Sequence, residues 1–201
     1  MNNLDKIKEE TKNVTLVAAT KYIDSEKMRS LFDFGITNFG ENRVDSLLKK
    51  KKELSDLNIT WHFIGHLQKN KAAKVINEIE YLHSLDSLEL AEIIDKKRTT
   101  PLKCFVELHL ASSNTKYGVK EENLEFFMKK IKDFKNINVI GFMAMSDKNS
   151  SEEEIKNVFE KARFFKNIYS LKDLSMGMSD DYKIAIKCGA TFVRLGRILY
   201  Y

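Results

Sequence analysis

Short apolar runs alternate with longer amphipathic stretches along the whole chain. An apolar run of about four to eight residues is typical of a buried strand, and apolar residues at helical spacing indicate an amphipathic helix. The pattern predicts strands at residues 14–19, 36–39, 60–64, 81–84, 103–110, 138–144, 172–175 and 191–195. It predicts helices at residues 24–34, 41–54, 68–79, 87–97, 121–134, 151–169 and 180–188.

Polar residues at the start of several predicted helices support these assignments. Asp24, Ser87 and Ser151 each stand just before an amphipathic stretch. Their side-chain oxygens can accept hydrogen bonds from the backbone N–H groups that have no partner in the first helical turn. We therefore expect these three residues to cap helices.

The alternation of strands and helices predicts an α/β fold. Strands that are joined through helices pair in parallel, because each return trip needs a crossover. About eight such units favour a closed (β/α)₈ TIM barrel, with an open doubly wound sheet as the alternative. No linker or composition break divides the chain, so we expect residues 1–201 to form a single domain. No helix is predicted after the eighth strand, and we expect an N-terminal helix near residues 2–12 to cover the gap.

The charge of the chain narrows the classes of ligand only a little. The net charge is +5, which suits a phosphorylated ligand or nucleic acid. The basic run at residues 49–52 lies in a helical pattern and is interpreted as a solvated helix face. No nucleic-acid motif accompanies it, so we expect no nucleic-acid partner.

No segment of the sequence indicates export or membrane insertion. The first residues lack the apolar core of a signal peptide, and no apolar run is long enough to cross a bilayer. Cys104 and Cys188 show no metal-ligand spacing and are interpreted as buried, reduced thiols. We expect a cytoplasmic protein with no membrane partner. No long apolar surface stripe calls for assembly, so we also expect a monomer.

The first predicted strand ends on a lysine, Lys21. One interpretation is a solvated strand terminator. The other is a reactive amine at the mouth of the barrel, where the carboxyl ends of the strands carry active sites. Partial burial there would favour the neutral amine, which can condense with an aldehyde to form a Schiff base.

The loops after the last two strands have the composition of a phosphate site. Gly177 and Gly196 would let backbone N–H groups approach a phosphate closely, and TIM barrels often bind phosphate at these two loops. Hydroxyls from Ser175 or Ser179 and a charge from Arg194 or Arg197 could complete the site. The alternative is that the glycines only make tight turns and that Ser179 only caps the last helix.

Other chemically interesting residues have plainer interpretations. A histidine inside a strand, such as His62, is more often a hydrogen-bonded core residue, and Met143 is most simply core packing. Lysines such as Lys71 and Lys116 are interpreted as surface charges. No serine–histidine–aspartate order and no metal cluster is evident, so no metal site is expected.

Eight stretches of the sequence match one known family in the order in which that family has them. They are VAATKY (17–22), FGENRV (39–44), WHFIGHLQKNK (61–71), HSLDS (83–87), NTKYG (114–118), GFMAM (141–145), LSMGMSDDY (174–182) and FVRLGR (192–197). Through these stretches the sequence resembles the pyridoxal phosphate homeostasis protein family. The resemblance covers nearly the whole chain.

The resemblance implies a barrel like the N-terminal domain of alanine racemase, with pyridoxal 5′-phosphate (PLP) held as a Schiff base on Lys21. It implies an arginine near the pyridine nitrogen, which is Arg194 here. It also implies a phosphate site that includes Ser175 and the segment Gly196-Arg197. The remaining positions that it places around the cofactor are Asn42, His62 and Met143.

The resemblance further implies a protein that carries, buffers or delivers PLP without enzymatic turnover, with apo-enzymes that depend on PLP as recipients. A cationic arginine facing the ring nitrogen disfavours its protonation and weakens the ring as an electron sink. A low-activity amino-acid racemase and a class I aldolase-like barrel are the alternatives. Transfer of the aldehyde through Lys69, Lys71 or Lys116 is a further hypothesis.

Overall fold

The computed structural model describes residues 3–110 and 117–200, in which strands and helices alternate. The strands are β1 (Thr15–Ala19), β2 (Asn38–Glu41), β3 (Thr60–Phe63), β4 (Tyr81–Leu85), β5 (Leu102–His109), β6 (Val119–Lys120), β7 (Ile137–Met143), β8 (Asp173–Ser175) and β9 (Phe192–Leu195). The helices are α1 (Asn3–Glu10), α2 (Ser25–Asp33), α3 (Val44–Glu53), α4 (Lys69–Val75), α5 (Leu88–Lys97), α6 (Glu121–Lys130), α7 (Glu152–Ile168) and α8 (Tyr182–Lys187). Two short 3₁₀ helices follow α6 and β9, η1 (Ile131–Asp133) and η2 (Arg197–Leu199).

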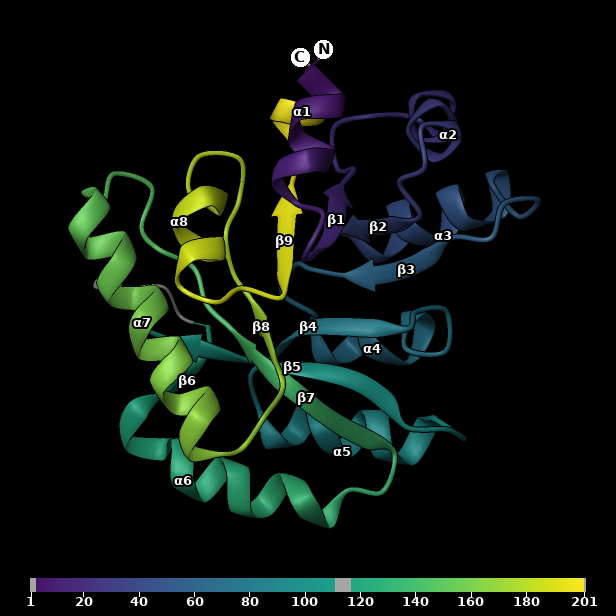
Figure 1. Ribbon diagram of the computed structural model, residues 1–201. Helices are drawn as coiled ribbons and strands as arrows, with labels where there is room; N and C mark the ends of the chain where they lie inside the picture. The colour runs from purple at the N-terminus through teal and green to yellow at the C-terminus, as the bar shows by residue number, and fades with distance from the viewer. Residues whose placement is uncertain (1–2, 111–116, 201) are drawn as a thin grey trace.

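The sheet closes into a barrel. Its strand order is β4-β3-β2-β1-β9-β8-β7-β5-β6, and β4 also pairs with β5. Every pairing is parallel, and the helices lie outside the strands (Figure 1). The predicted (β/α)₈ barrel is therefore confirmed, and the β4–β5 pairing excludes the open sheet. The two-residue strand β6 adds to β5 beyond the barrel and is too short for periodicity to reveal.

Helix α1 occupies the place of the helix that the sequence pattern lacks after the last strand. On one side, Glu10 accepts a hydrogen bond from the Tyr182 hydroxyl and pairs with Lys183, both of α8. On the other side, Lys8 donates to the carbonyl of Phe34, just after α2. Asn3 donates to the carbonyl of Ile198, so α1 and η2 lie side by side (Figure 1). The prediction that the N-terminal helix covers the gap is confirmed.

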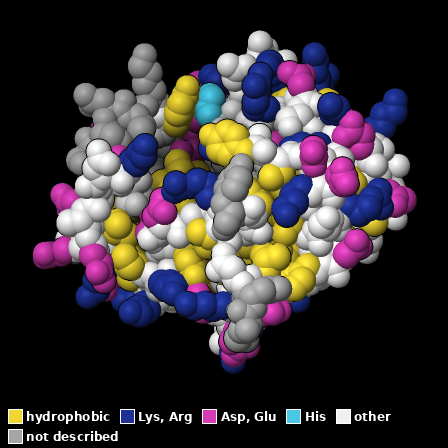
Figure 2. Space-filling model, turned by 90° about the horizontal axis from the view of Figure 1, so that it is seen from above, with side chains coloured by type: hydrophobic (Ala, Val, Ile, Leu, Met, Phe, Trp, Pro, Cys, Tyr) yellow, Lys and Arg dark blue, Asp and Glu magenta, His cyan; other side chains and the backbone are white. Residues whose placement is uncertain are grey.

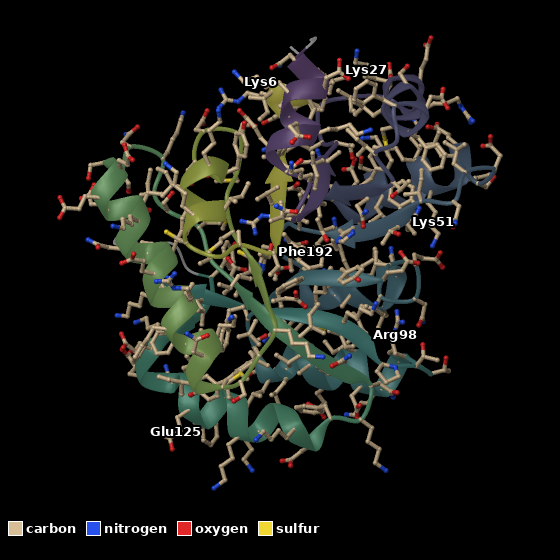
Figure 3. The ribbon with its side chains drawn as sticks, viewed as in Figure 1. Lys6, Lys27, Lys51, Arg98, Glu125 and Phe192 are labelled. Carbon is tan, nitrogen blue, oxygen red and sulfur yellow. The ribbon has the colours of Figure 1, made fainter. Side chains whose placement is uncertain are left out.

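The barrel interior is filled by side chains from alternate strand positions. Val17, Phe105, Met143 and Phe192 form one buried cluster, and Phe192 lies inside the ring of strands (Figure 3). A larger apolar core lies between the strands and the helices. No helix of the described residues is long and apolar enough to cross a membrane.

The predicted helix starts are confirmed, but some boundaries are wrong. Asp24 and Ser87 accept hydrogen bonds from backbone N–H groups in their helices, and Ser151 forms a capping box with Glu154. The second strand ends at Glu41, inside the stretch predicted as the helix 41–54. Sequence pattern missed this because Gly40 and Glu41 carry no apolar signal for a strand.

Candidate functional site

A pocket of about 510 Å³ opens at the carboxyl ends of β1, β8 and β9. This volume is within the range of small-molecule sites, which is about 300–1,000 Å³. Seen from above, the end of the molecule toward which β9 runs presents hydrophobic and basic side chains close together (Figure 2). The pocket is lined by Ala19, Lys21, Tyr22, Asn42, Ile64, Met145, Lys148, Met178, Ser179, Asp180, Arg194, Gly196, Arg197 and Tyr200.

Lys21 lies on a turn directly after β1 and lines the pocket. The turn is closed by a hydrogen bond from the Ile23 N–H to the carbonyl of Thr20. The Lys21 ammonium lies 4.7 Å from the centre of the Tyr22 ring. The expectation of partial burial is wrong, because Lys21 is exposed on this turn. The position at the barrel mouth is as predicted.

Arg194 is buried on β9, and its side chain contributes to the wall of the pocket. Its guanidinium donates to the carbonyl oxygen of Ser175 at 2.8 Å, to the Ser175 hydroxyl at 2.5 Å and to the Ala144 carbonyl at 3.4 Å. Burial lowers the pKa of Arg194 to about 10, while Asp181 and Glu107 oppose this effect. The guanidinium therefore remains cationic at neutral pH.

A chain of hydrogen bonds continues from Arg194 through the barrel interior. Ser175 Oγ lies 2.7 Å from His83 Nδ1, His83 Nε2 lies 2.9 Å from His62 Nδ1, and His62 Nε2 lies 3.0 Å from Asn38 Oδ1. Arginine can only donate, so the Ser175 hydroxyl accepts from it and donates its own hydrogen to His83. The same logic makes His83 donate to His62 and His62 donate to Asn38.

Both histidines in this chain are neutral. Burial, with Lys103 nearby, lowers the pKa of His62 to about 3. Burial lowers the pKa of His83 well below its usual range, and His62 and Arg194 add to the effect. A proton on either ring would need a second acceptor inside an apolar, aromatic interior.

Three of the residues predicted around the cofactor do not line the pocket. Ser175 and His62 are fully buried members of the hydrogen-bond chain. Met143 is buried in the barrel cluster, and Met145 lines the pocket in its place. Met143 is the last residue of β7, whereas Met145 follows the end of the strand and so lies nearer the mouth of the barrel. Both His62 and Met143 are buried, as their plainer interpretation as core residues predicts, and their contact with the cofactor stays a prediction.

The loops after β8 and β9 meet at the pocket. The Gly196 N–H donates to the Ser179 hydroxyl at 3.2 Å, and Arg197 pairs with Asp180 at 2.6 Å. Gly177 has φ +92, and a side chain there would collide with Ala185 of α8 at 2.6 Å. Gly177 is thus required by the turn and by helix packing, whereas Gly196, Ser179 and Arg197 line the pocket.

Asn42 lines the pocket from the end of β2. Its Oδ1 is buried without a hydrogen-bond partner among the described residues. An unpaired buried acceptor costs about 1–3 kcal/mol, so this amide is suited to a ligand. Asn42 also borders a second pocket of about 220 Å³, which Arg43, His66 and Lys71 line with it.

Glu107 is a buried carboxyl on β5 that faces the same interior as Arg194. Burial and, less strongly, the nearby Asp86 raise the pKa of Glu107 to about 7, while Arg194 opposes them. Glu107 is not among the residues predicted for the site. An acidic residue in an otherwise apolar strand, KCFVELHL, was the signal that could have found it.

The basic run at residues 49–52 is not wholly a solvated face. Lys50 is buried, and its ammonium lies 2.6 Å from a carboxylate oxygen of Glu41. The interpretation of the run is therefore wrong at this one position. Lys50 falls on the inward face of α3 because it follows Val44 and Leu47 at helical spacing.

The lysines proposed for transfer are placed apart from the pocket wall. Lys69 pairs with Glu89 at 3.7 Å, and Lys71 pairs with Asp45 at 3.8 Å. Lys116 lies outside the described residues. Sequence reasoning missed Tyr22, Met178, Lys148 and Tyr200, which do line the pocket. Of these, Tyr200 could be found only in three dimensions, because its hydroxyl donates to the distant Ala19 carbonyl.

Comparison with known proteins gives matches over the whole chain. The alanine racemase N-terminal domain family matches residues 1–201. A pyridoxal phosphate homeostasis protein from Aquifex aeolicus is 35% identical over 194 residues, which cover 92% of this chain and 85% of that protein. One from Helicobacter pylori is also 35% identical, over 93% of this chain and 87% of its own length.

Solved structures agree with these matches. PipY of Synechococcus elongatus without PLP has a TM-score of 0.95 at 30% identity, covering 99% of this chain and 98% of PipY. PipY with PLP bound has a TM-score of 0.92 at 28% identity, covering 100% of both chains. Alanine racemase from Corynebacterium glutamicum has a TM-score of 0.78 at 14% identity, which shows a shared fold alone. The chain therefore belongs to the pyridoxal phosphate homeostasis protein family and has the barrel of the alanine racemase N-terminal domain.

Proposed function

We propose that this chain binds PLP as a Schiff base on Lys21 and serves PLP homeostasis as a carrier without catalytic turnover. The observation that carries the proposal is that Lys21, Arg194 and the Gly196 loop line one pocket. Apo-enzymes that depend on PLP are the proposed recipients. The PLP-bound structure of the relative PipY supports the choice of ligand.

The residues around the pocket fit the three polar parts of PLP. Lys21 would hold the aldehyde, and Ser179, Gly196 and Arg197 would hold the phosphate. The absence of a side chain at Gly196 matters here, because a Cβ would lie 3.3 Å from the Tyr200 hydroxyl. The buried Oδ1 or, with the amide turned over, Nδ2 of Asn42 offers a hydrogen-bonding partner to the ring substituents.

Arg194 is the reason to favour a carrier over an enzyme. When bound, PLP can act as an electron sink for carbanion chemistry, and it does so best with a protonated ring nitrogen. Arg194 is cationic at neutral pH and would face that nitrogen, so it disfavours the second positive charge. The hydrogen-bond chain from Ser175 to Asn38 contains no acid that could supply a proton to the ring nitrogen.

Borohydride reduction of the PLP-loaded protein, followed by peptide mass spectrometry, tests the proposal. We expect the reduced adduct on Lys21 and its loss, with loss of the yellow absorption band, in Lys21→Ala. Lys148→Ala is the matched control, because Lys148 lines the same pocket and should leave the adduct intact. An adduct on Lys148 or on another lysine would reject the assignment.

A second measurement separates the carrier from the racemase. The loaded wild type is incubated with single enantiomers of amino acids, and the appearance of the other enantiomer is followed. We expect none above the level of Lys21→Ala. Racemisation that rises with the loaded fraction would show an enzyme and overturn the carrier proposal.

A further inference from the structure

A buried ion pair lies directly behind the turn that carries Lys21. Glu41 ends β2 and is fully buried, and Lys50 reaches it from α3 at 2.6 Å. Taking two charges out of water is costly, so a buried pair is weak evidence for a stabilising role. The second carboxylate oxygen of Glu41 has no hydrogen-bond partner among the residues described, which adds to the cost.

Thr20 is the residue that this ion pair holds. The Lys50 ammonium donates to the Thr20 carbonyl at 2.7 Å, and the Thr20 hydroxyl donates to Glu41 at 2.6 Å. The Thr20 N–H donates to the carbonyl of Gly40 at 3.0 Å. Every polar group of this fully buried threonine is thus fixed, and the next residue in the chain is Lys21.

The carbonyl of Thr20 also closes the turn itself. It accepts the Ile23 N–H at 3.1 Å, which makes residues 20–23 a four-residue turn with Lys21 at its second position. Lys50 therefore adds a charged donor to the acceptor that defines this turn. Charge-assisted hydrogen bonds are roughly twice as strong as neutral ones. The turn is held more firmly than its exposure suggests.

We propose that Glu41 and Lys50 are positioning residues that hold the Lys21 turn so that the Lys21 amine meets the aldehyde of PLP. This inference rests on the proposed function of Lys21. The same contacts make Lys50 a poor candidate for the Schiff base. Its ammonium is bound to Glu41 and Thr20, and it does not line the pocket.

Lys50→Met tests the proposal, with Lys51→Met as the matched control. Lys51 projects from the outside of α3 (Figure 3) and contacts Glu78, away from the Lys21 turn. The rate of Schiff-base formation is followed by absorbance after PLP is added to each apo-protein. We expect Lys50→Met to be slower by about tenfold to a hundredfold, because a misplacement near 1 Å can cost that much. Lys51→Met should stay within about twofold of the wild type.

An analogue of PLP with a methyl group in place of the aldehyde separates positioning from pocket damage. It can occupy the pocket but cannot condense with an amine. If Glu41 and Lys50 position Lys21, Lys50→Met binds this analogue with wild-type affinity while its Schiff base forms slowly. Equal losses in both measurements would show a general structural role and overturn the proposal.

Two further variants keep the test decisive if Lys50→Met folds poorly. Glu41→Gln/Lys50→Met removes both charges, so it leaves no unpaired ion in the interior. We expect it to fold and still to form the Schiff base slowly, whereas Lys50→Arg should recover most of the rate. Wild-type rates in the double variant would overturn the proposal. A wild type that forms no adduct on Lys21 would instead reject the proposed function and this inference with it.

Discussion

Two buried polar networks support the pocket, and they are built in opposite ways. The network of Thr20, Glu41 and Lys50 lies between the barrel and α3 and contains a full ion pair. The network that runs from Arg194 to Asn38 lies inside the barrel and passes through two neutral histidines. The first fixes a backbone turn, and the second fixes a side chain.

The difference teaches how each network fails. An ion pair in the interior is costly to assemble, and removing one partner leaves the other charge stranded. A neutral chain costs less, but its donors and acceptors must all point one way. We therefore expect the first network to be sensitive to substitution and the second to be sensitive to protons.

Among the single substitutions, the largest effect should come from breaking the ion pair on one side. Lys50→Met leaves Glu41 charged and unpaired, and we expect the free energy of unfolding to fall by about 3–5 kcal/mol. Urea unfolding followed by circular dichroism measures this. Glu41→Gln/Lys50→Met should recover most of the loss, and Lys51→Met should cost about 1 kcal/mol or less. A double variant as unstable as Lys50→Met would show that stranded charge is not the cause.

Lowering the pH tests the second network, because it contains the two neutral histidines. Unfolded histidines take up protons below their ordinary pKa of 6.5, whereas the folded pKa of His62 is about 3 and that of His83 is also far below 6.5. Stability is therefore complete above about pH 6.5 and is lost as the pH falls toward 3. Each histidine should contribute about 1.4 kcal/mol per pH unit in this window. Urea unfolding at pH 4, 5, 6 and 7 checks the slope.

Glu107 opposes the histidines and supplies the control. Its carboxyl keeps its proton up to a pKa of about 7 when folded but loses it near 4.5 when unfolded. Its contribution is complete below pH 4.5 and is lost as the pH rises through 7. Glu107→Gln should therefore be more stable than the wild type at pH 8, by about 1–3 kcal/mol, with a steeper acid slope. The same slope in both proteins would contradict the raised pKa of Glu107.

An effect of similar size is expected from Ser175→Ala, which cuts the neutral chain between Arg194 and His83. It should cost about 1–3 kcal/mol in unfolding free energy and also weaken PLP binding, because Arg194 loses its orientation. Ser84→Ala removes another buried hydroxyl, which donates to the Gly65 carbonyl, and should leave PLP binding unchanged. Equal PLP affinities in the two variants would show that Ser175 does not orient Arg194 for PLP binding.

The barrel and the placement of Lys21 follow from the sequence because both depend on local patterns. Apolar runs mark the strands, and a lysine directly after the first run must lie at the mouth. Arg194 follows in the same way from its place on the last strand. These predictions needed no knowledge of which side chains touch.

The two networks could not be predicted in this way, because each joins residues that are distant in sequence. Strand alternation is consistent with inward side chains at His62 and His83. Only the closed barrel, however, brings Ser175 next to His83. Lys50 is one of four consecutive lysines, so its composition gives no sign that it is buried. The inward spacing of Val44, Leu47, Lys50 and Leu54 was the available signal, and charge composition overrode it.

The pairing of β1 with β9 joins Thr15 to Phe192, across almost the full length of the chain. During synthesis on the ribosome, β1 cannot pair with β9 until nearly all of the chain has emerged. Throughout that interval the growing sheet presents two open edges, which are sites for pairing with other chains. A chaperone that shields one open edge of the sheet would therefore matter most near the end of translation.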